Sequence, residues 1–223
     1  MAVEHVTIVG GTGDEGFGLA LRWASAGMRV TIGSRSKEKG EDAASRLRVE
    51  LPDATVEGLE NTEAVAASDL VVVTVPFAGQ AATYKSIAEH LREKAVVVDC
   101  TVPVAAAVGG RATRVLGVWE GSAAQQAAAL LPKGTRMCAA FQTLAAVALN
   151  DLSRELDGDV LVCGSKSGKE MVRELVEVIP RLRYVDAGPL ENARIVEPIT
   201  ALLIGINHRH GVDASGIHIT GLS

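Results

Sequence analysis

The sequence has few aromatic side chains and no block of basic charge. Phe, Trp and Tyr make up only 3% of the 223 residues, so no ring surface for stacking nucleic-acid bases is expected. The 22 Lys and Arg residues are outnumbered by 27 Asp and Glu residues, giving a net charge of -5. Neither nucleic acid nor an anionic membrane is therefore an expected partner. The apolar runs are also shorter than the roughly 18 residues that identify a membrane span.

Cysteine is equally scarce. Cys100, Cys138 and Cys163 are widely spaced and form no Cys-x-x-Cys pair, which is typical of reduced, buried thiols in a cytosolic protein. No signal peptide is recognised ahead of the first apolar run. We therefore expect a cytoplasmic protein. Its 48% of hydrophobic residues exclude a disordered chain, and the core should consist of Ala, Val, Leu and Ile.

A glycine-rich segment follows the first apolar run, residues 6–9. It consists of Gly11, Thr12, Gly13, Asp14, Glu15 and Gly16. Glycines at this spacing between a strand and a helix are typical of a dinucleotide-binding βαβ unit, where the helix N-terminus receives the pyrophosphate. Glycines also make ordinary turns, but a helical pattern follows here and Gly27 can end it.

The end of the second apolar run indicates which dinucleotide is bound. An NAD site places Asp or Glu about 20 residues after the glycines, whereas Arg meets the 2′-phosphate of NADP. Here Ser34 and Arg35 stand at that point and no acid does. A hydroxyl and a guanidinium suit a phosphate, so we expect NADP(H). Lys39 would add positive charge nearby.

Apolar runs alternate with helical patterns along the chain. Strands are predicted at residues 3–9, 29–33, 55–58, 70–75, 95–99, 136–141, 160–164 and 184–186. Helices are predicted at residues 15–26, 37–51, 61–68, 79–91, 122–131, 167–179 and 189–210, and a loop at 104–121. This alternation predicts an α/β fold, a Rossmann-type doubly wound parallel sheet with a small C-terminal lobe. The pattern loses regularity near residue 150, which predicts an NADP-binding domain over residues 1–150 and a smaller part over 151–223.

Ligands of such sheets bind at the carboxyl ends of the strands. Small or restricted residues at three of these ends, Pro76, Val102 and Ala146, are candidates for contact with the nicotinamide and its ribose. No acid–base team for alcohol or ketone chemistry is recognisable, so no catalytic residue is assigned. His208 and His210 are two residues apart and face different sides of a helix, so no metal site is expected. Hydride transfer between two cofactors needs little from the protein beyond alignment.

These motifs resemble the F420-dependent NADP oxidoreductases, which reduce the deazaflavin coenzyme F420 with NADPH. The similarity covers almost the whole chain. It is carried by segments at residues 8–13, 33–35, 74–76, 162–164, 186–190 and 192–207. The resemblance implies reversible hydride transfer between NADP(H) and F420, and association into a homo-oligomer, a dimer.

The resemblance also implies roles for individual residues. The NADP site would comprise Gly11, Thr12, Gly13, Asp14, Glu15, Gly16, Ser34, Arg35, Lys39, Pro76, Val102 and Ala146. The substrate side would comprise Gln142, Leu144 and Asn207. Relatives often carry His where Gln142 stands, and Gln can still hydrogen-bond a ring carbonyl.

Two other readings stay open from the residues. One is an NADPH-dependent reductase of another flat acceptor, such as a flavin or a pterin, or of a small imine. The other is a non-catalytic NADP-sensing module, which would bind the nucleotide tightly and turn over no acceptor.

Overall fold

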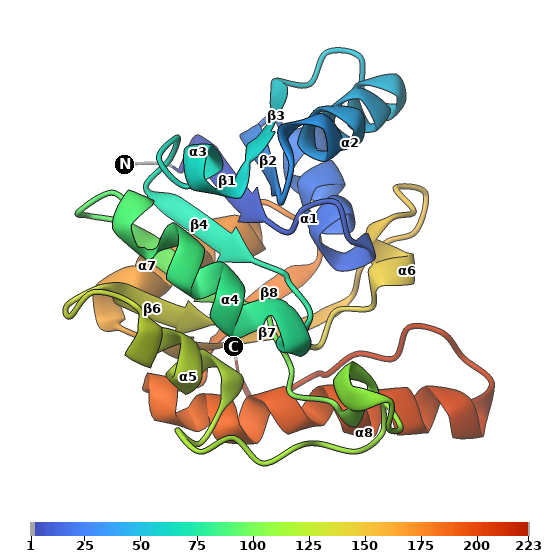
Figure 1. Ribbon diagram of the computed structural model, residues 1–223. Helices are drawn as coiled ribbons and strands as arrows, with labels where there is room; N and C mark the ends of the chain where they lie inside the picture. Colours follow the sequence, from blue (N-terminus) through green and yellow to red (C-terminus); the bar gives the residue numbers. More distant parts are fainter. Residues whose placement is uncertain (1–2, 223) are drawn as a thin grey trace.

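The structure is a computed structural model that describes residues 3–222, and it contains one continuous eight-stranded sheet (Figure 1). Its strand order is β3-β2-β1-β4-β5-β6-β7-β8. The strands are β1 (His5–Val9), β2 (Arg29–Ser34), β3 (Val56–Glu60), β4 (Leu70–Val73), β5 (Val96–Asp99), β6 (Arg136–Ala139), β7 (Gly158–Gly164) and β8 (Leu182–Asp186). The expected Rossmann-type fold is confirmed.

The strand register brings the ends of the central strands to one edge. Val9 pairs with Val73, Val73 with Asp99, and Asp99 with Ala139, all in parallel. The segments that leave these four strands therefore begin side by side. This edge is where open α/β sheets bind their ligands.

One strand pair departs from the parallel sheet that the sequence predicts. β7 runs antiparallel to β6, and β8 is parallel to β7. The connection at residues 140–157 holds only the four-residue helix α6 (Ala146–Leu149) and does not recross the sheet. A parallel neighbour needs a crossover of a dozen or more residues, usually a full helix. Without one, β7 enters from the edge at which β6 ends, and its last residues, Cys163 and Gly164, pair with Ala139 and Cys138. Residues 151–223 thus contribute β7 and β8 to the same sheet.

Helices cover both faces of the sheet, and alternate residues of each strand face opposite layers. Leu70 and Val72 pack in one apolar cluster with α1, α2, α6 and α7, whereas Val71 and Val73 pack in another with α4 and α5. The helices are α1 (Asp14–Ser25), α2 (Lys37–Glu50), α3 (Asn61–Ala64), α4 (Phe77–Ile87), α5 (Ala123–Leu130), α7 (Lys166–Glu177) and α8 (Ala193–His210). The described part of the chain also contains three 3-10 helices, η1 (Ala88–His90), η2 (Ala105–Val108) and η3 (Leu190–Asn192). No helix of residues 3–222 is both long and apolar enough to cross a bilayer.

Two local expectations are wrong. Residues 104–121 are not a plain loop, because they contain η2 and a bridge between Val104 and Val115. The segment lies beside α8 (Figure 1). Side chains of both, including Thr113 and Val115, line one groove. Asn61 does not cap a helix to residue 68. Glu60 takes the cap position, and α3 ends after one turn, at Ala64.

Candidate functional site

A cavity of about 920 Å³ opens at the carboxyl edge of the sheet. Most of the predicted site residues line it: Thr12, Gly13, Asp14, Glu15, Ser34, Arg35, Pro76, Val102, Gln142, Leu144 and Ala146. Its volume is within the usual range for ligand sites. The structure therefore brings together residues that lie more than 130 positions apart in the sequence.

Four predicted residues do not line this cavity. Gly11 and Gly16 lie just behind it in the turn. Lys39 is exposed on α2. Its backbone N–H donates to Oγ of Ser36 (3.5 Å), and Ser36 is the residue that caps this helix. The Asn207 Oδ1 atom accepts a hydrogen bond from the Ser215 backbone (3.0 Å), which ties α8 to the following loop. Contacts of these residues with a ligand stay predictions.

The glycine turn presents free backbone donors to the cavity. Gly10 and Gly11 donate to the Gly33 carbonyl (3.1 Å each), which fixes the turn against β2. Helix α1 begins after Gly13, and no side chain caps it. The first amide to bond within the helix is that of Phe17, to the Gly13 carbonyl (2.8 Å). The Gly13 amide donates to the Gly10 carbonyl (3.1 Å), whereas the amides of residues 14–16 have no such partner among the described residues and stay available to an anion, as at other phosphate-binding helix N-termini.

Two glycines are required by close packing in this turn. Gly10 has a φ of +79°, and a Cβ there would lie 2.7 Å from Val75 Cγ1. A Cβ on Gly16 would lie 2.4 Å from Thr74 Oγ1 and 2.8 Å from Gly11 Cα. The N-terminus of α1 can approach the end of β4 only because no side chain intervenes.

Ser34 and Arg35 form one end of the cavity. Ser34 is the last residue of β2 and is buried, whereas Arg35 is exposed. Arg35 forms no ion pair with any other residue between positions 3 and 222. Its guanidinium is therefore free to meet a phosphate at the cavity rim.

The opposite end is built by a strained turn after β6. Phe141 has a φ of +71°, a region that costs a non-glycine residue about 1–3 kcal/mol. Its ring is buried and packs edge-on against Trp23, with centroids 5.5 Å apart. The Leu144 amide closes the turn on the Phe141 carbonyl (3.0 Å). This packing holds Gln142 and Leu144 at the cavity wall.

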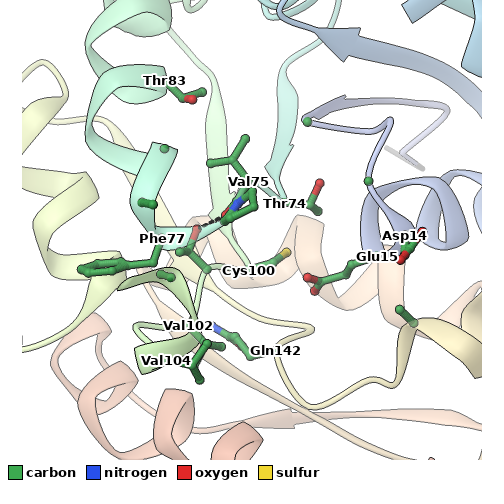
Figure 2. A pocket seen from close by; sticks show the side chains of 18 of the residues that line it. Asp14, Glu15, Thr74, Val75, Phe77, Thr83, Cys100, Val102, Val104 and Gln142 are labelled. Atoms are coloured by element: carbon green, nitrogen blue, oxygen red, sulfur yellow. Dashed lines mark hydrogen bonds between the residues drawn. The ribbon is translucent and has the colours of Figure 1, made fainter. Parts of the chain in front are cut away.

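Gln142 is fixed from two sides. Its side-chain Nε2 donates to the backbone carbonyl of Asp99 (3.2 Å). The backbone carbonyl of Gln142 accepts from Thr200 Oγ1 of α8 (2.7 Å). One Nε2 hydrogen is thus engaged by β5, whereas the second Nε2 hydrogen and Oε1 stay available to a ligand. The side chain lies close to Val102 and Val104 in Figure 2.

A buried carboxylate supports this end from behind. Asp99 accepts hydrogen bonds from Tyr84 Oη, Thr101 Oγ1 and Gln80 Nε2, each 2.9 Å long. Burial raises the pKa of Asp99 to about 6, although these three donors favour the charged form. Asp99 does not line the cavity, and its hydrogen bonds show a structural role.

Cys100 lies at a strand end where a ligand is expected, and it lines the cavity. Other lining residues were not anticipated from the sequence, among them Asn61, Thr74, Thr200 and Ile204. Thr74 follows β4 directly, so its position at a strand end could have identified it. Burial raises the pKa of the Cys100 thiol far above its usual value, so it is neutral and a poor nucleophile. Thr200 and Ile204 come from α8, and no local pattern points to them.

Two buried oxygens in the cavity have no hydrogen-bond partner among residues 3–222. They are Asn61 Oδ1, beside Gly33, and Glu15 Oε1. Buried polar atoms of native proteins are nearly always paired. Their presence in one cavity, together with free helix amides and a free guanidinium, fits a polar ligand that spans it.

The fold and this cavity define a Rossmann-type dinucleotide-binding protein. The family described as "NADP oxidoreductase coenzyme F420-dependent" matches residues 5–103. An F420-dependent NADP reductase of Methanothermobacter thermautotrophicus is 46% identical over 99% of this chain and 96% of its own length. That of Methanocaldococcus jannaschii is 40% identical over 97% of this chain and 98% of its own. The chain belongs to the family of F420-dependent NADP reductases.

Solved structures agree on the fold. A structure from Arthrobacter sp. FB24, described as a proposed F420-dependent NADP reductase, covers 97% of this chain and 99% of its own with a TM-score of 0.80 and 24% identity. Pyrroline carboxylate reductase of Plasmodium falciparum, with NADP bound, covers 93% of this chain and 66% of its own with a TM-score of 0.60 and 12% identity. At these identities the likeness establishes the fold alone.

Proposed function

We propose that this protein transfers a hydride reversibly between NADP(H) and the deazaflavin coenzyme F420. Its membership in the reductase family, over nearly the whole chain, carries the proposal. The two rings supply the chemistry: NADPH, oxidised F420 and a proton give NADP⁺ and reduced F420. The protein has to bind both rings, align them and exclude water.

The residues of the cavity fit the dinucleotide part of this role. The free amides at the start of α1 would hold the pyrophosphate, and Ser34 and Arg35 the 2′-phosphate. Pro76, Val102 and Ala146 would line the nicotinamide and its ribose. Lys39 would add charge near the phosphate without entering the cavity.

The other end of the cavity fits a second flat ring. Leu144 gives an apolar wall, and Gln142 would hydrogen-bond the ring, with the second Nε2 hydrogen donating to a ring carbonyl or Oε1 accepting from a ring N–H. Thr200 and Ile204 extend this end along α8, so the residues after position 150 complete the substrate side. Asn207 would act further along the same helix. On this basis we propose that residues 1–150 form the NADP-binding part and that residues 151–223 form a smaller part.

Stopped-flow absorbance tests the function directly. Purified protein is mixed with NADPH and F420, and the deazaflavin absorbance is followed against a mixture without protein. NADPH-dependent bleaching far above that background is expected. Bleaching at the background rate would refute the proposal, and parallel mixtures with a flavin, a pterin and a cyclic imine would show whether another acceptor is reduced instead.

We also propose that two copies associate. Large apolar side chains are exposed on α8 and on the neighbouring segment, including Ile195, Leu202, Val108 and Trp119, the last 99% exposed. Apolar surface of this kind supports a contact between subunits. Light scattering should give twice the mass of the chain, and a monomer mass would contradict it.

The three buried, unpaired cysteines support a cytoplasmic location, which fractionation of the host cells would test.

A further inference from the structure

Glu15 lines the cavity, and one oxygen of its carboxyl group is buried without a hydrogen-bond partner among the described residues. Glu15 is the second residue of α1, and its carboxyl group points toward Cys100 at the end of β5 (Figure 2). The Oε1 atom is closed to solvent and has no hydrogen-bond partner among the described residues. Buried polar atoms are nearly always paired, so this carboxyl group lacks a partner that a bound water or a ligand has to supply.

No residue between positions 3 and 222 forms an ion pair with this carboxyl group. From β5 it faces Asp99 and the neutral thiol of Cys100, while Asp14 on its own helix is exposed. The end of β4 and helix α6 bring uncharged residues. Arg22 lies further along α1 and donates to backbone carbonyls of residues 148–154. Burial, and secondly Asp99, raise the pKa of Glu15 to about 8, so the group is neutral at pH 7.

The carboxyl group lies at the end of the cavity assigned to the nicotinamide. Cys100 is two residues before Val102, and Gln142 bonds to the residue before Cys100. All three line the same end. A group directed at Cys100 therefore approaches the nicotinamide ring more closely than the 2′-phosphate, which belongs at Arg35.

We propose that Glu15 sets the preference of the site between oxidised and reduced NADP, by contact with the nicotinamide ring. This inference rests on the proposed function. The oxidised ring carries a positive charge and the reduced ring is neutral, whereas the phosphates are the same in both. An ionised Glu15 attracts only the oxidised ring, and a protonated Glu15 leaves the two nearly equal.

The sign of the pH dependence follows. The cationic ring favours the carboxylate, so the pKa of Glu15 is lower in the complex with NADP⁺ than in the complex with NADPH. Between these two pKa values NADP⁺ binding releases a proton and NADPH binding does not. The affinity for NADP⁺ relative to NADPH therefore rises with pH, about tenfold for each unit between the two pKa values.

Titration calorimetry from pH 6.5 to 9.5 tests the inference. The dissociation constants of NADP⁺ and NADPH are measured on the full chain, each in two buffers of different ionisation enthalpy, which gives the protons released. For the unmodified protein we expect the ratio of affinities to move about tenfold toward NADP⁺ across this range. Glu15→Gln keeps the shape of the side chain but cannot ionise, and should give a flat ratio and no difference in proton release. Glu15→Leu provides a second variant that cannot ionise.

Glu197→Gln is the matched control. Glu197 is a buried carboxyl with a pKa raised to about 7, chiefly by burial, but it caps α5 by accepting from the Ala123 and Ala124 amides and does not line the cavity. This variant should keep the trend of the unmodified protein. A ratio independent of pH in the unmodified protein would overturn the inference alone. Failure to bind either dinucleotide would overturn the proposed function and the inference with it.

Discussion

Arg35 offers the sharpest test of how the site selects NADP(H) over NAD(H). It follows β2 at the cavity rim, is exposed and forms no ion pair among residues 3–222. Its removal therefore leaves no buried charge behind and breaks no contact that holds the fold. The substitutions Arg35→Ala and Arg35→Glu should act on the ligand and hardly on stability.

The magnitude follows from the contact that would be lost. A hydrogen bond to a charged group contributes about 1.5–3 kcal/mol, so Arg35→Ala should reduce the preference for NADPH over NADH by about 10- to 150-fold. In Arg35→Glu a like charge faces the phosphate. At about 4 Å in water this repulsion adds about 1 kcal/mol, a further factor of about five. NADH lacks the phosphate, so its affinity should change little.

The assay is the dissociation constant of each dinucleotide, measured at low and high salt. Screening should shrink the effect of Arg35→Glu as salt rises. Arg48→Ala, an exposed position near the end of α2, removes the same charge at a distance and serves as the control. An unchanged ratio in both Arg35 variants would remove this residue from the site and refute the assignment of the 2′-phosphate to the end of β2.

Two further predictions concern the packing that builds the site. Gly16→Ala places a Cβ 2.4 Å from Thr74 Oγ1, so the start of α1 must move away from the end of β4. The affinity for the dinucleotide should fall at least about 100-fold, and the free energy of unfolding should fall by about 1–3 kcal/mol. An unaltered dissociation constant would contradict the geometry of the turn. Arg22→Met removes a buried guanidinium that donates to the carbonyls of Ala148 (2.6 Å), Leu149 (3.1 Å) and Arg154 (2.9 Å). Urea denaturation should show a loss of about 2–4 kcal/mol, and a loss below about 1 kcal/mol would mean that water replaces these bonds.

The first half of the fold could be predicted because its signals are local. The strand before Gly10 and the helix after Gly13 are consecutive in sequence, and the short, β-branched valine run of β4 is typical of a buried strand. The direction of β7 is different. It depends on whether residues 140–157 recross the sheet, and nothing in their composition states that. The pattern of apolar residues in a strand predicts which residues are buried, but it does not show whether the strand runs parallel or antiparallel to its neighbour.

The substrate side of the cavity shows the same limit. Gln142 was expected there from family resemblance, but its orientation depends on the positive φ of Phe141, which the packing on Trp23 and the hydrogen bond from the Leu144 amide support. Thr200, which holds the carbonyl of Gln142, lies 58 residues further along the chain. Asn61 was expected to cap a helix, a local role that Asn often has. The fold gives the cap to Glu60 and directs Asn61 into the cavity.

Asp14 and Glu15 make the point most clearly, because they are adjacent and carry the same functional group. Carboxylates in the first turn of a helix are ordinarily read as solvated charges that complement the helix dipole. Asp14 is exposed and fits that reading. Glu15 is turned by about 100° around the helix axis, toward Cys100, and is half-buried. Burial is the main cause that raises its pKa to about 8, so it is mostly neutral at pH 7. Two carboxylates in the first turn would oppose a pyrophosphate, whereas one exposed charge and one neutral group oppose it much less. The two carboxyl groups thus differ in protonation because they point to different sides of α1, and because only Glu15 faces the end of β5.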